Sequence, residues 1–243
     1  MKNLFLLLSI VLLLFACKKE ESNKTYPKSL QKVLDHHGGI IPWKKAKTLS
    51  YTLKDEDHTI DLHSRKSIIT SANYSVGFDG KEVWLWQKKD SLFKKDPKFY
   101  YNLFFYFYAM PFVLADDGIL YEETTPLQYE GVSYPGIKIS YKPNVGTSPD
   151  DNYFIYYNPK TYQMEWLGYT VTYFSKQTST NVKMIRYNKW GDVNGFLLPK
   201  EITWYKTNKE NGSLESTGKI VTFENALVTE AAMANRFFEK PTE

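Results

Sequence analysis

The chain has a single cysteine, Cys17, among its 243 residues. A disulfide bond within one molecule is therefore impossible, and a zinc site built on paired cysteines is excluded. An excess of charge of one sign is also absent, because 31 Lys and Arg face 27 Asp and Glu and leave a formal net charge of +4. Since the charges are balanced and no basic stripe alternates with aromatic residues, we exclude nucleic acid as a partner.

Histidine is scarce as well, and all four histidines, His36, His37, His58 and His63, lie in the N-terminal quarter of the chain. Asp61 and His63 would share one face of a strand, and both residue types can bind zinc. The sequence nevertheless contains no HExxH motif and no zinc-finger spacing. Polar residues at a helix end and in a hairpin loop explain the group more simply, so we expect no metal site.

Motifs of nucleophilic catalysis are missing too. No Gly-x-Ser-x-Gly motif places a serine on a turn between a strand and a helix. Three pairs of neighbouring acids could suggest a glycosidase, but adjacent residues do not face each other across a substrate at the required separation of about 5 to 10 Å. These pairs are Asp116–Asp117, Glu122–Glu123 and Asp150–Asp151. We interpret them as solvated turns and a helix end, and predict no catalytic residue and no cofactor.

Long hydrophobic runs occur only at the N-terminus. Residues 4–16 are apolar apart from Ser9, follow the basic residue Lys2, and are too few to span a bilayer comfortably. This pattern predicts a signal peptide over residues 1–16. Its ending, Leu-Phe-Ala followed by Cys17, resembles the lipobox of bacterial lipoproteins, in which the cysteine sulfur is acylated and the cysteine becomes the new N-terminus. The alternative is a plain signal peptide or an N-terminal membrane anchor with an incidental cysteine.

Acylation of Cys17, for example with palmitate, would make a membrane the first partner of the protein, because two or more acyl chains give stable attachment. Residues 17–26 would then form a flexible, charged tether. The run Lys18-Lys19-Glu20-Glu21 resembles the basic-then-acidic signal of surface-exposed lipoproteins in Bacteroidota. We therefore expect attachment to the outer membrane, with surface display as an option, although composition alone supports only a spacer.

The remaining residues, 27–243, are enough for one domain with a sizeable core. Residues 27–37 have apolar positions spaced for an amphipathic helix, and glycines follow them. Ten segments rich in Tyr, Val, Ile, Thr and Trp follow, with little room for crossover helices, so we expect an antiparallel sheet. These segments are 48–53, 58–64, 66–78, 82–87, 136–141, 152–157, 163–174, 181–187, 197–205 and 219–227.

Two details of these strands bear on function. Asp79-Gly80 between two strand patterns predicts a tight hairpin that brings Trp84 and Trp86 onto one face of the sheet. The segments 153–157 and 166–174 are apolar on both faces, so either another element or a ligand must cover their second face.

Residues 98–114 are unusually aromatic, and aromatic residues make up 16% of the whole chain. The length of this segment between Pro97 and Gly118 favours a helix over a strand, and Pro111 should end or kink it near Met110. Because the segment is aromatic on every side, we expect it to be buried. It could be a core helix packed on a curved sheet, a lid over an apolar cavity, or a patch that dips into a membrane interface.

The order of these features resembles the lipoprotein-localisation (LolA/LolB-like) superfamily. The features are a signal peptide with a lipobox, a first helix, a long antiparallel meander and an aromatic helix between two groups of strands. The resemblance implies a half-open barrel that is capped by helices on its concave face and holds acyl chains. Several strings, among them His37-Gly38-Gly39 and Ser148-Pro149-Asp150-Asp151, also resemble an uncharacterised family of Bacteroidota lipoproteins, which implies no particular reaction.

We therefore predict a mainly β domain whose strongly curved antiparallel sheet of about ten strands forms a half-open barrel, with helices on the concave face. We expect a non-catalytic protein that binds a lipid, an acylated protein segment or another apolar ligand in the hollow. The predicted contact residues are Trp84, Trp86, Phe104, Phe105, Tyr108, Phe112, Trp166 and Tyr173. The alternatives are an interaction module with a filled core, which would bind a protein partner as an accessory subunit of a surface complex, and a hydrolase or metal-dependent enzyme.

Overall fold

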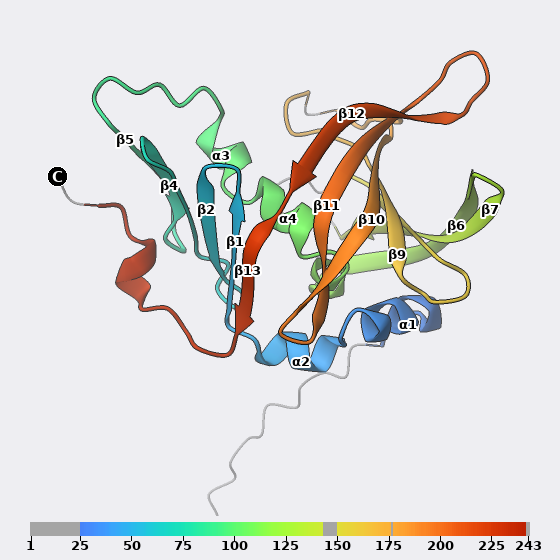
Figure 1. The fold of residues 1–243 in the computed structure, drawn as a ribbon, viewed down its shortest axis with the longest axis horizontal. Coiled ribbons are helices and arrows are strands. Elements are labelled where there is room, and N and C mark those ends of the chain that lie inside the picture. Colours follow the sequence, from blue (N-terminus) through green and yellow to red (C-terminus); the bar gives the residue numbers. More distant parts are fainter. Residues whose placement is uncertain (1–24, 143–149, 176, 242–243) are drawn as a thin grey trace, which may run out of the picture.

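The computed structural model describes residues 25–142, 150–175 and 177–241, which form two antiparallel sheets of six and seven strands (Figure 1). The six-stranded sheet has the order β13–β1–β2–β3–β4–β5, formed by β13 (Glu224–Thr229), β1 (Thr48–Leu53), β2 (Glu56–Asp61), β3 (Ser67–Thr70), β4 (Tyr74–Phe78) and β5 (Val83–Gln87). The seven-stranded sheet has the order β12–β11–β10–β9–β8–β7–β6, formed by β12 (Leu214–Thr222), β11 (Phe196–Thr207), β10 (Lys183–Val193), β9 (Met164–Tyr169), β8 (Tyr153–Tyr157), β7 (Val132–Tyr141) and β6 (Ile119–Tyr129).

The two sheets are connected by the consecutive strands β12 and β13. Only Phe223 separates β12 from β13, and its N–H donates a hydrogen bond to the carbonyl of Lys200 on β11. β12 pairs with β11 in one sheet and β13 pairs with β1 in the other. Both strand orders are linear, so neither sheet closes on itself, which confirms the predicted mainly β, half-open antiparallel fold.

The first two helices cover one end of the seven-stranded sheet (Figure 1). α1 (Lys28–His36) buries Leu30, Val33 and Leu34, as its apolar spacing predicts, and α2 (Ile40–Lys45) follows after two glycines with positive φ. Gly38 needs both its φ of 114° and its lack of a side chain, because an added Cβ would lie 2.5 Å from the Gly195 carbonyl oxygen. The helix predicted over residues 27–37 is confirmed.

The aromatic segment lies between the two sheets, as three short helical pieces. These are α3 (Pro97–Tyr100), α4 (Leu103–Tyr108) and the 3-10 helix η1 (Phe112–Ala115). The side chain of Asp96 caps α3 by accepting a hydrogen bond from the Lys98 N–H, and the non-helical backbone of Asn102 separates α3 from α4. The prediction of one continuous helix was therefore wrong, although its helical character and burial are confirmed.

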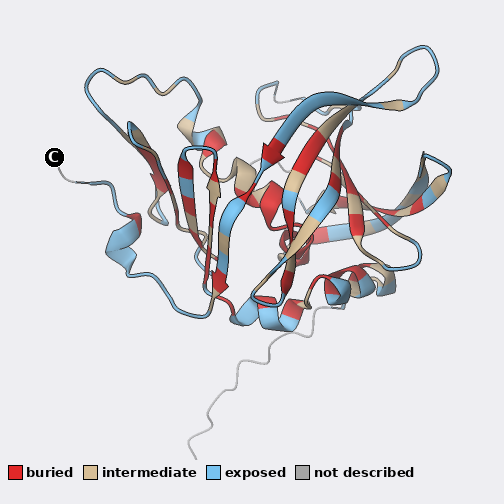
Figure 2. Cartoon of the chain, viewed as in Figure 1, coloured by how far each residue is buried: buried red, intermediate tan, exposed pale blue. Residues whose placement is uncertain are grey.

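The core fills the central part of the space between the sheets. Figure 2 shows buried residues concentrated along α4 and the strands around it, whereas the hairpin ends are exposed. The Tyr187 hydroxyl on β10 donates a hydrogen bond of 2.9 Å to the Phe107 carbonyl, which ties α4 to the seven-stranded sheet. Within the described ranges, no helix is long and apolar enough to cross a membrane.

The described residues form thirteen strands where ten segments were predicted, and several boundaries differ. The predicted segment 219–227 contains the end of β12 and the start of β13, which Phe223 separates. The segment 66–78 is a hairpin, since Ser71, Ala72 and Asn73 turn the chain between β3 and β4. The segment 163–174 is a strand only to Tyr169, and a loop follows it. β6 was not predicted, because Pro126 and the acidic pair Glu122–Glu123 interrupt its pattern. An edge strand tolerates both features, and the pairing of β6 with β7 shifts register between Thr124 and Leu127.

Candidate apolar ligand site

A cavity of about 360 Å³ lies between the aromatic segment and the seven-stranded sheet. Residues from α3 and α4 form one side, and residues from β7, β8, β9 and β11 form the other. The loop that follows β9 borders its mouth. A volume of this size falls near the lower end of the range of roughly 300 to 1,000 Å³ that is usual for small-molecule sites.

Aromatic rings form the floor of the cavity. Phe104 and Phe107 project from α4, and Tyr169 of β9 and Trp204 of β11 project from the sheet. The Phe107 ring packs against both, with ring centroids 5.4 Å from Tyr169 and 5.9 Å from Trp204. The indole N–H of Trp204 donates a hydrogen bond of 3.0 Å to the Tyr169 hydroxyl, so the polar atoms of the floor satisfy each other. The floor can therefore accept an apolar molecule without leaving these groups unpaired.

Neutral phenol groups form a second wall. Tyr141 of β7 and Tyr153 of β8 pack edge to face with ring centroids 6.0 Å apart. Burial raises the pKa of both phenols, so both hydroxyls stay protonated at physiological pH. Such groups can orient a ligand through hydrogen bonds, but they supply neither a base nor a charged nucleophile.

The mouth of the cavity is bordered by Tyr173 and Phe174 from the loop after β9. Phe99 of α3 holds this loop in place, with ring centroids 5.0 Å from Tyr173 and 4.9 Å from Phe174. The Tyr173 hydroxyl also donates a hydrogen bond of 3.0 Å to Asp96. Phe174 remains 67% exposed, so an apolar side chain faces solvent beside the mouth.

Charged groups around the cavity are mostly basic. Lys98, Lys183 and Lys219 come from α3, β10 and β12, and the only carboxylate among the described lining residues is Asp151. Asp151 is buried and accepts a hydrogen bond of 2.7 Å from the Thr172 N–H. Burial raises the pKa of Asp151 and outweighs the hydrogen bonds from Thr172 and Thr170. This carboxyl group supports the loop through Thr172.

Residues 44–217 match a family of unknown function, DUF6503, and so the match covers well over half of the chain. The chain belongs to this family. The matched range contains every described lining residue of the cavity except Lys219. No curated protein matches the sequence.

Three solved structures with a distant likeness to this DUF6503 chain are 7 to 10% identical to it. A LolA-superfamily protein from Nitrosomonas europaea is 10% identical over 87% of this chain and 97% of its own, with a TM-score of 0.44. A DUF1329 family protein from Desulfovibrio piger is 9% identical over 88% and 98%, with a TM-score of 0.47. An outer membrane lipoprotein-sorting protein domain from Vibrio parahaemolyticus is 7% identical over 82% and 94%, with a TM-score of 0.37.

Two of the eight predicted contact residues, Phe104 and Tyr173, line the cavity of this DUF6503 chain. Three others lie deeper between the sheets. The Tyr108 ring is 4.4 Å from that of Tyr51, Phe112 stacks on Trp43 at 4.3 Å, and the Phe105 ring lies beneath the Arg65 guanidinium at 5.0 Å. These three residues fill the central hollow and hold the aromatic segment in place.

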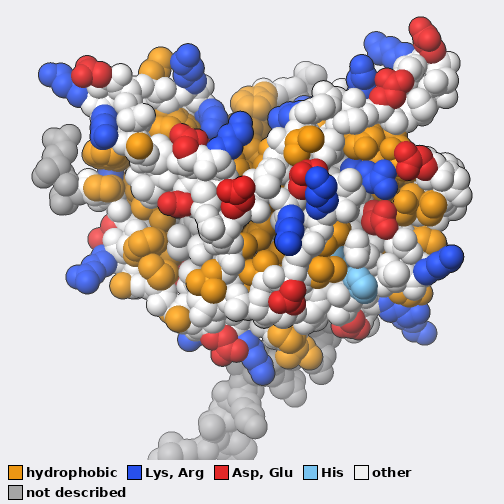
Figure 3. All heavy atoms as spheres, in the orientation of Figure 1, with side chains coloured by type: hydrophobic (Ala, Val, Ile, Leu, Met, Phe, Trp, Pro, Cys, Tyr) orange, Lys and Arg blue, Asp and Glu red, His pale blue; other side chains and the backbone are white. Residues whose placement is uncertain are grey.

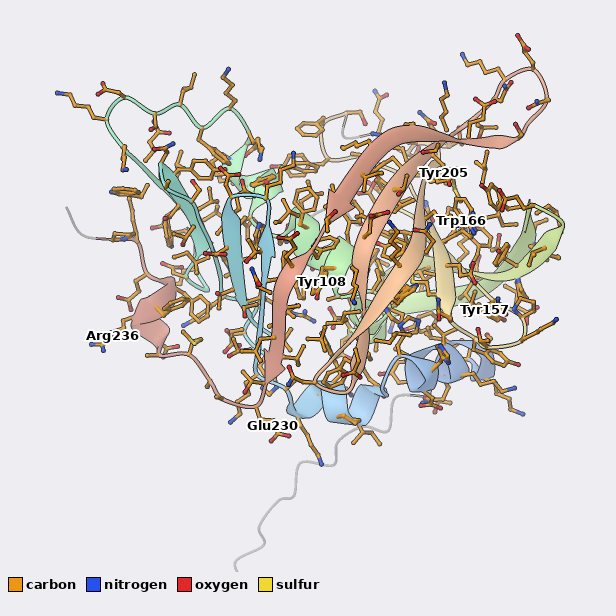
Figure 4. All side chains as sticks on the ribbon, viewed as in Figure 1. Tyr108, Tyr157, Trp166, Tyr205, Glu230 and Arg236 are labelled. Atoms are coloured by element: carbon orange, nitrogen blue, oxygen red, sulfur yellow. The ribbon has the colours of Figure 1, made fainter. Side chains whose placement is uncertain are left out.

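The three predicted tryptophans lie away from the cavity. The Trp84 indole donates a hydrogen bond of 2.9 Å to the Phe238 carbonyl in the C-terminal 3-10 helix η2 (Asn235–Phe238), and Trp86, two residues along β5, shares its face. Trp166 packs against Tyr205 with ring centroids 4.9 Å apart, and Figure 4 shows this pair far from Tyr108. Trp166 and Tyr169 are three residues apart on one strand, so they face opposite sides of the sheet.

Sequence reasoning missed the lining residues Phe107, Tyr153, Tyr169 and Trp204. All four were visible as aromatic residues in segments expected to be helical or extended. The pattern could not assign them to the inner face, because segments that are apolar on both sides give no register and a shift of one residue reverses every side chain.

The four histidines and the acids near them in sequence do not converge on one site. His37 is in the core beside β9, His58 contacts Glu56, and His63 is exposed with a hydrogen bond to the Lys44 carbonyl. Among the residues that the structure describes, no group of three His, Cys, Asp or Glu side chains could hold a metal ion. None of the four histidines lines the aromatic cavity.

A second hollow of about 400 Å³ lies between α1 and the strands β6 and β7. Its lining includes Lys28, Lys32, Glu122 and Glu123, so charges of both signs border it. The Lys32 ammonium donates a hydrogen bond of 3.0 Å to the Tyr162 hydroxyl across the rim. This hollow is polar and suits an apolar ligand less well than the aromatic cavity does.

Proposed function

We propose that this protein is a lipid-anchored, non-catalytic binder of an apolar ligand, namely a lipid or an acylated protein segment. The open aromatic cavity beneath α3 and α4 carries the proposal. Its floor is made of large apolar rings whose few polar atoms already have partners, and its mouth reaches solvent beside Phe174. An apolar chain in such a space would gain roughly 25 cal/mol for each Å² of apolar surface removed from water.

The polar groups at the cavity favour binding over catalysis. The phenols of Tyr141 and Tyr153 are neutral, and the one carboxylate among the described lining residues, Asp151, supports the β9–β10 loop through Thr172. The four histidines lie outside the cavity. Among the described lining residues, no pair of groups resembles a nucleophile beside its base. We therefore propose capture and release of a ligand without a chemical step.

Membrane attachment through acylated Cys17, with localisation at the outer membrane, is part of the same proposal. Cys17 and most of the tether lie outside the described residues, and the proposal for them rests on the lipobox pattern. A tethered binder would hold its cavity close to the bilayer from which an apolar ligand can be taken.

The cavity can be tested with an uncharged lipid, 1-monopalmitoylglycerol, titrated calorimetrically into the purified mature protein. We expect saturable binding by the wild type and a loss of about tenfold or more in affinity for Val171→Trp, because the larger side chain occupies part of the cavity. Ile41→Trp is the matched control, since Ile41 is 71% exposed on α2 and outside the cavity. Equal binding by Val171→Trp would reject the proposal, as would a wild type that binds neither this lipid nor charged lipids with the same acyl chain.

The alternative of an interaction module has one observation in its favour. The central part of the hollow is filled by Tyr108, Phe112 and their partners, and the aromatic cavity beside the β9–β10 loop is what remains open between the aromatic segment and the seven-stranded sheet among the described residues. In that case the exposed Phe174 would contact a protein partner, and the purified chain would carry no extractable lipid. Organic extraction followed by mass spectrometry separates the two functions.

A further inference from the structure

Lysines from three separate elements border the aromatic cavity. Lys98 lies on α3, Lys183 at the start of β10 and Lys219 on β12, and all three are exposed. The only described acid in the lining, Asp151, is buried and accepts the Thr172 N–H. The cavity therefore combines an apolar interior with a basic rim.

The three lysines are available to a ligand. Counting only partners within the described ranges, none of them lies within 4 Å of a carboxylate, whereas Lys138 and Lys189 pair with Glu122 and Glu201 on neighbouring strands. The Lys219 ammonium lies 4.2 Å from the centre of the Trp204 ring, which places this charge over the aromatic floor. Nearby Asp96 is engaged as the α3 cap and accepts the Tyr173 hydroxyl.

This local excess of positive charge differs from the surface as a whole. Figure 3 shows basic and acidic side chains interspersed over one face of the molecule, with hydrophobic side chains between them. The chain as a whole is nearly balanced in charge. Three cations without a carboxylate partner among the described residues lie at the edge of one apolar cavity. They would attract an anion and would hold it more weakly as salt is added.

We infer that the cavity binds an anionic amphiphile with a single acyl chain, whose chain lies among Phe104, Phe107 and Trp204 and whose headgroup lies between Lys98, Lys183 and Lys219. The modest cavity volume favours one chain over several. The shared chemistry of the ligand is an anionic headgroup on an apolar tail, so a fatty-acid carboxylate and a phosphate-headed lysolipid both qualify. This inference rests on the proposed binding function and adds the class of ligand to it.

Matched probes test the inference in calorimetric titrations below their micellar concentrations. Palmitate and palmitoyl lysophosphatidate are anionic, and 1-monopalmitoylglycerol carries the same chain without charge. We expect at least one anionic probe to bind about tenfold or more tightly than the uncharged probe at low salt, with the preference shrinking at high salt. Comparison of the carboxylate with the phosphate then distinguishes the two sources of the anion.

A triple variant, Lys98→Gln with Lys183→Gln and Lys219→Gln, should lose this preference and still bind 1-monopalmitoylglycerol. Its control removes the same charge at Lys89, Lys160 and Lys209, which are exposed and outside the cavity, and should behave as the wild type. If the wild type binds charged and uncharged probes equally, or the triple variant keeps the preference, the inference fails and the proposed function stands. If no probe binds, the proposed function itself fails. The salt dependence of the wild type tests the inference even if the triple variant does not fold.

Discussion

His37 shows how one residue can connect distant parts of the fold. Its side chain is fully buried; Nδ1 lies 2.9 Å from the Leu197 carbonyl and Nε2 accepts a hydrogen bond of 3.1 Å from the Met164 N–H. The ring is therefore the neutral tautomer with its proton on Nδ1, and it joins the end of α1 to β9 and β11. Burial, together with the neighbouring His36, lowers the pKa of His37 to about 4 against the opposing effect of the Leu197 hydrogen bond.

Because His37 is buried in its neutral form, acidic pH should lower the free energy of unfolding. The unfolded histidine titrates near pH 6.5 and the folded one near 4, so the unfolded state binds more protons between these values. The contribution of neutral His37 to the free energy of unfolding is therefore complete above pH 6.5. It is lost as the pH falls to 4, by up to about 3 kcal/mol. Urea denaturation at several pH values should show this slope for the wild type and a flatter one for His37→Gln. His63→Gln, at an exposed histidine, should keep the slope; an unchanged slope in His37→Gln would contradict the assignment.

At the scale of elements, a buried carboxylate fixes the aromatic segment to the six-stranded sheet. Glu56 on β2 is 3% exposed and accepts hydrogen bonds from the hydroxyls of Tyr74 on β4 and Tyr100 on α3, the latter at 2.6 Å. Burial alone would raise the pKa of Glu56. Hydrogen bonds from His58, Tyr100 and Tyr74, with the charge of Lys95, outweigh burial and lower this pKa to about 2.

Removal of this carboxylate should loosen α3 from the sheet. We expect Glu56→Gln to lower the free energy of unfolding by about 1 to 3 kcal/mol at pH 7, since the amide replaces a charged acceptor of several hydrogen bonds. Because the folded pKa is depressed, the wild-type advantage should be complete above pH 4.5 and decline as the pH falls towards 2. Glu224→Gln, at an exposed glutamate on β13, should change stability by less than about 0.5 kcal/mol. Equal effects of the two substitutions would show that the network contributes nothing.

Elements that depend on neighbouring residues in the sequence could be predicted, whereas elements that depend on the whole sheet could not. The Asp79–Gly80 turn was clear because the Asp79 carboxylate accepts the N–H groups of Lys81 and Glu82, a purely local arrangement. β6 could not be predicted from its own residues. Pro126 is tolerated because β6 lies at the edge of the sheet, and that position depends on how all the strands are ordered. An aromatic interior was predictable from composition, whereas the particular rings that face the cavity depend on register, which only the paired strands determine.

At the scale of the whole molecule, the proposed lipid anchor gives a direct test. Cys17→Ala should move the protein from the membrane fraction to the soluble fraction of its host and abolish metabolic labelling with a palmitate analogue, because the acylated sulfur is removed. Ser22→Ala, in the same predicted tether, should leave both readouts unchanged. Membrane retention with unchanged labelling in Cys17→Ala would exclude this cysteine as the anchor.

The junction of the two sheets also governs when the fold can be completed. Thr48 at the start of β1 lies opposite Thr229 at the end of β13, and β13 continues the line of β12. A chain that emerges N-terminus first from a ribosome or a translocation channel can therefore pair β1 with β2 early, but it leaves the other edge of β1 exposed long before β13 arrives. Since pairing between segments so distant in sequence is intrinsically slow, the inner edge of the first sheet stays open to chaperones or to other chains until the last strand has emerged.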